Sequence, residues 1–215
     1  MGAKTWMLVY ADSSARDALR ALPALDRAAT LRLATTLFPG ETLKPLNDGD
    51  LSYTCPPDNQ ICVGVFPGVS VVAAKEFGGD YPSRLPTRFL AAGGKGSVTI
   101  HAMHSVVDWF AYAQWSNGQL VRALSLSPDS GILEDVGPRM TFEEPYWAGE
   151  HPATEEGDDE YAFPFHPLDL GEAALAHLFG YQIEGVIDDS LLEAERVPLA
   201  RYERSGARRF WQFWR

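Results

Sequence analysis

Apolar and polar residues form short blocks along the chain, and each block predicts a strand or a helix. Residues 5–10 are apolar almost throughout and predict a buried strand. Two helices are expected next: one over residues 15–22, preceded by two serines that can cap it, and one after Asp26, where apolar residues recur every four positions. The turn-rich residues 41–60 are predicted to form a loop.

The following blocks predict paired strands. Residues 61–66 and 69–74 are β-branched runs separated by Pro67 and Gly68, a pattern typical of a hairpin. Residues 83–92 predict a short helix that ends at two glycines. Three more strands are expected, the last two joined by a hairpin turn: 98–103, 107–115 and 119–126.

The order of these elements predicts the fold class. The first six follow the ferredoxin-like order βαββαβ, and an additional β-hairpin and a C-terminal helix over residues 170–179 come after them. We therefore expect an α+β fold, with a mostly antiparallel sheet and helices on one face. Residues 1–195 are expected to form a single domain, and residues 196–215 a basic aromatic tail.

Composition narrows the class of protein. The 215 residues carry a net charge of −11, and the shares of hydrophobic (46%) and charged (22%) residues are typical of a globular protein. An acidic chain does not favour a nucleic-acid partner, because binding the phosphate backbone requires a basic surface. The N-terminal apolar run is too short for a signal peptide, and no run suits an integral membrane segment. With Cys55 and Cys62 expected to be reduced, the protein is predicted to be cytoplasmic.

The charge is unevenly distributed along the chain. Residues 143–160 contain eight carboxylates and no Lys or Arg, which is typical of a solvated loop but also suits cations or a basic partner. Residues 196–215 carry six arginines and one glutamate, +5, which leaves −16 for residues 1–195. The end of this tail interleaves arginines with four large aromatic residues: Phe210, Trp211, Phe213 and Trp214. We expect it to dock on the domain or on a partner subunit, the alternatives being an anionic membrane surface and single-stranded nucleic acid.

Four segments have a distinctive sequence: Met1-Gly-Ala-Lys-Thr-Trp6, His101-Ala-Met-His-Ser-Val-Val-Asp-Trp-Phe110, Leu124-Ser-Leu-Ser-Pro-Asp-Ser-Gly131 and Pro145-Tyr-Trp-Ala-Gly-Glu-His-Pro152. In these segments the chain resembles an uncharacterised bacterial family, a domain of unknown function, over about residues 1–180. That family has no established activity, cofactor or catalytic residues. The resemblance therefore implies a single soluble domain and no mechanism.

His101, His104 and Asp108 are the first candidate for chemistry. Two histidines and a carboxylate are ligand types for zinc or another divalent cation. On a helix their spacing would place all three on one face, but the flanking residues favour strands, on which positions 101 and 104 point to opposite faces. Two interpretations stay open: a divalent metal site, and structural histidines bonded to a neighbouring backbone.

A second candidate is the turn over residues 127–131 and the acidic residues after it. Carboxylates such as Asp129 and Glu134 can act on a sugar or hold a divalent cation, although Ser-Pro-Asp-Ser-Gly is also an ordinary turn sequence. If this turn meets the histidine segment in space, four residues form a polar cluster: His104, Asp108, Asp129 and Glu134.

No complete catalytic motif occurs in the sequence. A phosphate-binding loop, a Gly-x-Ser-x-Gly elbow and a His-Glu-x-x-His motif are all absent. We therefore expect a non-enzymatic binding or interaction protein with no cofactor. The alternative is a metal-assisted hydrolase or transferase, with the polar cluster as its catalytic residues and with three metal ligands: His101, His104 and Asp108.

Overall fold

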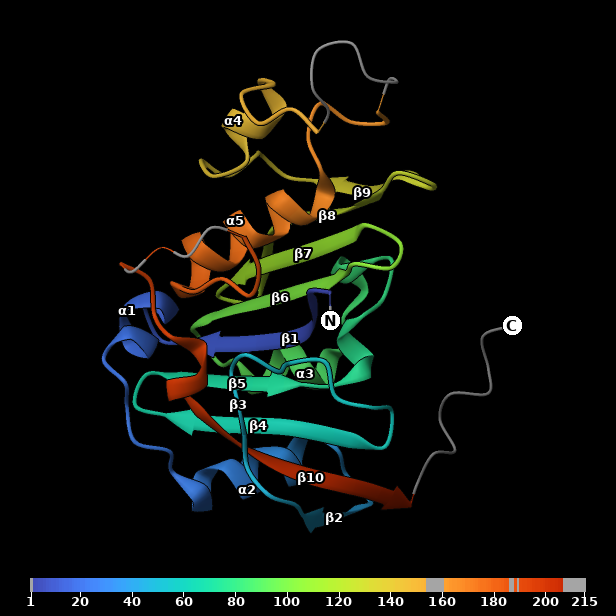
Figure 1. The fold of residues 1–215 in the computed structure, drawn as a ribbon. Coiled ribbons are helices and arrows are strands. Elements are labelled where there is room, and N and C mark those ends of the chain that lie inside the picture. The colour runs from blue at the N-terminus through green and yellow to red at the C-terminus, as the bar shows by residue number, and fades with distance from the viewer. Residues whose placement is uncertain (1, 154–160, 186–187, 189, 207–215) are drawn as a thin grey trace.

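The computed structural model describes residues 2–153, 161–185, 188 and 190–206, which contain ten strands and five α-helices (Figure 1). The strands are β1 Lys4–Ala11, β2 Glu41–Pro45, β3 Gly49–Asp50, β4 Gln60–Phe66, β5 Val69–Ala73, β6 Ser97–His104, β7 Trp109–Ser116, β8 Gln119–Ser127, β9 Gly131–Val136 and β10 Pro198–Gly206. The α-helices are α1 Ala15–Arg20, α2 Arg27–Leu37, α3 Thr87–Ala92, α4 Glu144–Trp147 and α5 Pro167–Phe179. Three short 3₁₀ helices are also present: η1 Lys75–Phe77, η2 Pro82–Arg84 and η3 Ala194–Arg196.

All ten strands belong to one antiparallel sheet. Their order is β2-β10-β4-β5-β1-β6-β7-β8-β9, and β3 pairs with β10 beside this path. The α+β class and the antiparallel sheet are therefore confirmed, and the second hairpin and the C-terminal helix are present. The ferredoxin-like order is not confirmed, because the sheet extends well beyond the strands from which it was expected.

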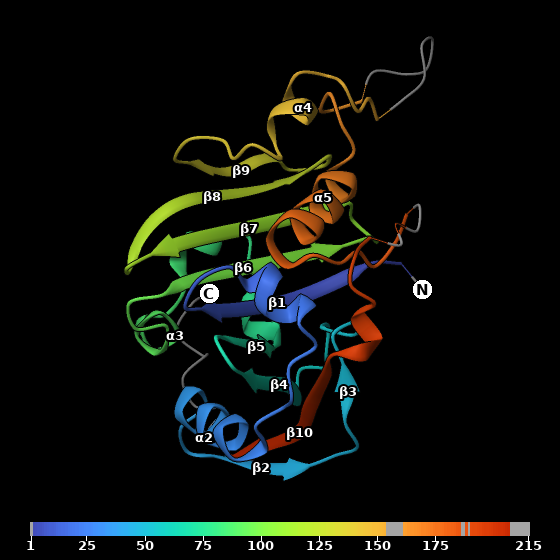
Figure 2. The same ribbon diagram turned by 90° about the vertical axis from the view of Figure 1, so that its left-hand side faces the viewer.

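Helices cover both faces of the sheet, so the expectation of helices on one face is wrong. Alternate residues of β1 enter two separate cores: Met7 and Val9 enter one, Trp6 and Leu8 the other. Helices α1 and α5 pack side by side on the first face, and α2 and α3 cover the second (Figure 2). The physical reason is that a strand with apolar residues at consecutive positions must bury both of its faces.

Local signals placed many elements where they were expected. The Asp26 side chain caps α2 by accepting the N–H of Ala29 at 2.9 Å. Asn117 and Gly118, with φ of 51° and 75°, form the turn between β7 and β8. Gly180 adopts φ 82° and ends α5, as glycine does at a helix C-terminus.

The unpredicted strands lie in segments with few apolar residues. Strands β2 and β3 form within residues 41–60, which were predicted to be a loop, and β9 follows the turn at 127–131. Strand β10 lies inside the expected tail, yet it pairs with both β2 and β4, so residues 198–206 belong to the sheet. The aromatic tail residues Phe210, Trp211, Phe213 and Trp214 lie outside the described residues.

Arg204 holds β10 in the sheet. Its guanidinium donates to Glu41 (Nε–Oε2, 2.7 Å) and to Glu76 (Nη1–Oε2, 3.0 Å), and it stacks on the ring of Phe38 at 4.5 Å. All three charged side chains are at least 86% buried. The end of β10 is thereby fixed to the beginning of β2 and to η1. None of the helices within the described ranges has the length and apolar character needed to cross a membrane.

Replacing Arg204 with Met should strongly destabilise the fold. The change leaves Glu41 and Glu76 buried without a counter-charge, which costs about 3–5 kcal/mol of unfolding free energy. Urea denaturation measures this loss. Arg27→Met is the control, because the Arg27–Asp48 pair lies at the surface and its loss should change stability only slightly. Equal losses in the two variants would contradict the assigned role of Arg204.

Candidate functional site

His101 is a buried structural residue between β6 and α5. Its Nε2 lies 2.9 Å from the carbonyl oxygen of Gly171, and its Nδ1 lies 2.8 Å from the hydroxyl of Thr5. A carbonyl can only accept, so Nε2 carries the proton and Nδ1 accepts from Thr5. Burial lowers the pKa of His101 to about 4, so the ring is neutral near pH 7. The side chain therefore fastens α5 to the sheet.

The structure separates the three predicted metal ligands. His104 lies on the opposite face of β6 from His101, with its ring 5.6 Å from that of Trp6. Asp108, in a turn with φ 44°, instead faces His166, whose Nε2 is 3.6 Å from its carboxylate. Across the described ranges, no group of three or more His, Cys, Asp or Glu side chains is placed to hold a metal ion.

His104 and Asp129 do come together, in a hollow of about 290 Å³ that we call the aromatic hollow. Its floor is formed by Trp6 and Trp109, whose rings lie 6.1 Å apart and are almost fully buried. Burial lowers the pKa of His104, and the charge of Lys4 lowers it further, so this ring is neutral near pH 7.

Glu134 and Asp108 lie elsewhere. The carboxylate of Glu134 accepts the backbone N–H of Ser83 at 3.0 Å and also the Ser83 hydroxyl, which ties β9 to η2. Of the four predicted catalytic residues, the structure therefore brings only His104 and Asp129 into one hollow.

A buried ion pair positions α4 beside the sheet. Arg122 on β8 is fully buried and donates to both carboxylate oxygens of Glu143, at 2.9 and 2.7 Å. Glu143 also accepts the N–H of Met140 at 2.8 Å and the hydroxyl of Tyr112. Burial alone would raise the pKa of Glu143, but these bonds lower it overall, so the pair stays ionised. Because Glu143 immediately precedes α4, the pair fixes Tyr146 in place.

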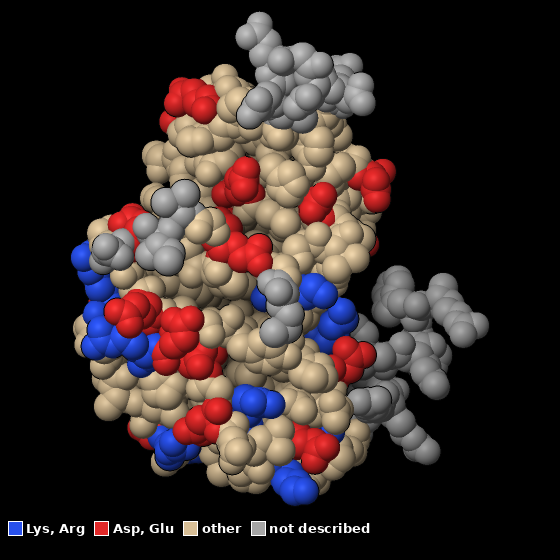
Figure 3. Space-filling view, in the orientation of Figure 1, with Lys and Arg blue, Asp and Glu red and all other residues tan. Residues whose placement is uncertain are grey.

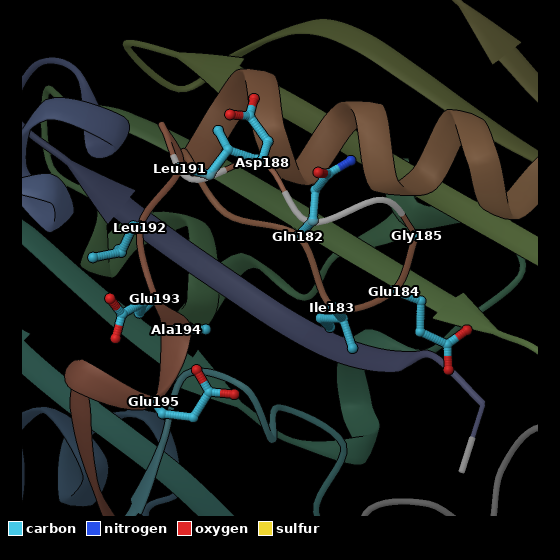
Figure 4. A pocket seen from close by; sticks show the side chains of 10 residues that line it. All are labelled: Gln182, Ile183, Glu184, Gly185, Asp188, Leu191, Leu192, Glu193, Ala194 and Glu195. Atoms are coloured by element: carbon cyan, nitrogen blue, oxygen red, sulfur yellow. The ribbon is translucent and has the colours of Figure 1, made fainter.

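Two hollows meet beside α5, and we call them together the acidic groove. One, of about 450 Å³, lies between Tyr146 and the first turns of α5, and the other, of about 540 Å³, lies along the segment that follows this helix. They share Gln182, Glu184 and Gly185. Figure 4 shows Glu184 on one side of the larger hollow and Glu193 and Glu195 on the other.

The groove is lined by carboxylates. Six contribute to it: Asp169, Glu172, Glu184, Asp188, Glu193 and Glu195. None of the described side chains that line it is Lys or Arg. Figure 3 shows the wider setting, in which acidic side chains are spread around α5 while Lys and Arg gather mainly in the lower half of this face. This lining gives the groove an excess of negative charge.

Glu172 shapes this groove. It is 7% exposed, whereas the other five carboxylates are exposed. Its Oε2 accepts the N–H of Ile183 at 2.8 Å and its Oε1 that of Glu184 at 3.2 Å, so it holds the segment after α5 against the helix. Burial raises the pKa of Glu172 to about 7, although these two bonds oppose the shift. The charge of the groove consequently changes near neutral pH.

His166 positions the start of α5. Its Nδ1 accepts the N–H of Leu168 at 3.3 Å, which caps the helix, and its Nε2 faces the carboxylate of Asp108. The Nδ1 contact occupies one ring nitrogen, and the 3.6 Å separation between Nε2 and the Asp108 carboxylate is too long for a hydrogen bond.

Sequence reasoning missed the acidic groove. His166, Asp169 and Glu172 recur every three residues, a spacing that gathers them on one side of a helix. Four more carboxylates of the groove follow within residues 184–195. Those signals were present, but the meeting of α4, α5 and the segment after α5 depends on tertiary packing.

Comparisons with known proteins give one match. A family model described as "Family of unknown function (DUF6928)" matches residues 5–202. The search of curated proteins and the search of solved structures each found no match. The matched range includes every described residue of the acidic groove except Ala3.

Replacing Glu172 with Gln should change how stability depends on pH. The folded pKa of about 7 lies above the ordinary 4.5, so the folded protein binds more protons between these values and its stability falls as pH rises through them. Urea denaturation at pH 4.5 and at pH 8 measures this effect. Between these two pH values, the free energy of unfolding of the wild type should fall by on the order of 3 kcal/mol more than that of Glu172→Gln. The other titrating groups are common to both proteins. If the free energy of unfolding depends on pH in the same way in both, Glu172 has an ordinary pKa.

Proposed function

The chain belongs to this family of unknown function, and we propose that it is a non-enzymatic binding protein whose acidic groove takes an organic cation. The observation that carries the proposal is the set of six carboxylates in one groove whose described lining has no Lys or Arg. A cleft lined by one sign of charge concentrates ligands of the opposite sign.

The size and lining of the groove favour a linear polyamine. Hollows of about 450 and 540 Å³ are in the range that holds small ligands. Because the carboxylates are distributed over both hollows, a ligand with several separated ammonium groups can pair with more of them than a compact cation can. Tyr146, with His151 stacked on it at 4.4 Å, adds an aromatic surface suited to a cation.

The same contacts favour binding over proton transfer. The Nδ1 of His166 already accepts the N–H of Leu168, and both oxygens of Glu172 already accept backbone N–H groups. The remaining carboxylates are exposed to solvent. These groups are suited to holding a positive charge in place.

A metal-assisted hydrolase or transferase is the second candidate, supported by the meeting of His104 and Asp129 in the aromatic hollow. A neutral imidazole and a carboxylate that line one hollow can act in acid–base chemistry on a substrate between them. Elemental analysis of protein purified without a histidine tag tests the metal. Hydrolysis of p-nitrophenyl esters that is lost in His104→Gln would favour this candidate over simple binding.

We further propose that the protein acts in the cytoplasm. Cys55 and Cys62 are both free thiols, which suits a reducing compartment.

Spermidine should bind to the chain in isothermal titration calorimetry, and the groove should account for it. Glu184→Gln should weaken binding at least about tenfold, or about 1.4 kcal/mol, because Glu184 lines both hollows. Glu144→Gln removes an exposed carboxylate of α4 that does not line the groove, and it should leave the affinity unchanged.

The affinity for spermidine should also rise between pH 6 and pH 8. Glu172, with a pKa of about 7, gains its negative charge over this range and then attracts the ammonium groups more strongly. Glu172→Gln should reduce the pH dependence. Loss of affinity in Glu144→Gln equal to that in Glu184→Gln would contradict the location of the site.

A further inference from the structure

We propose that the acidic groove is occupied by residues 207–215 of a second copy of the chain. This rests on the proposed function, since the segment is itself an organic cation. Its sequence, Ala-Arg-Arg-Phe-Trp-Gln-Phe-Trp-Arg, contains three arginines and no acidic residue. The segment lies outside the described residues and follows directly on Gly206, where β10 ends.

The groove matches this segment in charge. Glu184, Glu193 and Glu195 are exposed carboxylates around the larger hollow (Figure 4). Arginine is the cation best suited to them, because its planar guanidinium donates two parallel hydrogen bonds to one carboxylate.

The groove also has an apolar component. Ile183 and Leu192 line the larger hollow, Tyr146 lines the smaller one, and all three are partly buried against the core. Aromatic side chains flanked by arginines can pack on such a surface while the guanidinium groups pair at its rim. Trp and Arg are also the residues that most often dominate protein–protein binding.

The geometry of β10 favours a second copy over the same one. Glu193 and Glu195 line the groove immediately before β10 begins, and β10 then runs away from them toward β2 (Figure 1). A nine-residue strand carries the chain about 26 Å from its first residue. The main chain of Arg208 and Arg209 can extend at most about 11 Å beyond Gly206, less than half the length of β10, so their pairing with Glu193 and Glu195 is easier from a second copy.

The attachment point of the segment is also fixed. Arg204 pairs with Glu41 and Glu76 two residues before Gly206, so the end of β10 cannot swing back toward the groove. Reciprocal exchange of residues 207–215 between two copies gives a closed dimer, the most common symmetric assembly.

Charge reversal on each side of this contact tests the proposal in the full chain. Sedimentation equilibrium should show a dimer for the wild type. The double variants Arg208→Glu/Arg209→Glu and Glu193→Arg/Glu195→Arg should each raise the dimer dissociation constant at least tenfold. Combining all four changes should restore it to within about threefold of the wild-type value. Asp12→Arg/Asp58→Arg, which alters two exposed carboxylates outside the groove by the same charge, should leave the dimer intact.

Each other outcome overturns the proposal. A wild-type protein that is monomeric at 100 µM would exclude exchange between copies. If the tryptophan fluorescence of that monomer changes in Glu193→Arg/Glu195→Arg, the segment occupies the groove of its own copy. Binding of the chain to anionic vesicles without self-association would assign the segment to a membrane surface. Reversal on one side that changes nothing, or a combined variant that is not restored, excludes the charge contact.

A spermidine titration separates this proposal from the proposed function. Spermidine should bind more tightly to Arg208→Glu/Arg209→Glu than to the wild type, because the segment no longer competes for the groove. Equal binding to both proteins would overturn occupancy by the segment and leave the cation site standing. Absence of binding to both, with the charge-reversal results as expected, would overturn the polyamine site alone.

Discussion

The carboxylate of Glu172, buried beside α5, accepts the N–H groups of Ile183 and Glu184, and the acidic groove depends on this contact. A second contact, one residue earlier in the helix, supports it. His101 donates to the carbonyl of Gly171, and Gly171 has no side chain, which lets α5 approach Met103 and Phe110 closely. The helix is thus fixed to the sheet on one side and to the segment after it on the other, and the two hollows share that segment.

This arrangement links the groove's charge to its occupant. Burial raises the pKa of Glu172 to about 7, so ionising it in an empty groove near neutral pH costs free energy. The exposed carboxylates Asp169 and Glu184 add to this cost through like-charge repulsion. A cation in the groove would favour the ionised form and reverse part of the shift. Cation binding and proton release from Glu172 are therefore expected to be coupled.

The strands with continuous apolar sequence and the helix ends with capping residues could be predicted, because their causes are local. Alternation along β6 likewise anticipated that His101 and His104 would point to opposite faces. Strands β2 and β10 could not be predicted from the sequence. They carry charged residues whose burial becomes favourable only when Arg204 meets Glu41 and Glu76. Asp108 and Glu134 were predicted to join His104 if their two segments met in space, but their partners, His166 and Ser83, lie far away in the sequence. The groove was missed for the same reason: its residues come from three segments that only the packed core brings together.

The most direct test of a cation site is the pKa of Glu172, measured from its side-chain carboxyl ¹³C shift with and without saturating spermidine. In the free protein the pKa should lie well above the ordinary 4.5, near 7. With spermidine bound it should fall, because a positive charge beside the carboxylate favours its ionised form. Identical titration curves with and without spermidine would show that no cation binds beside Glu172 and would contradict the account.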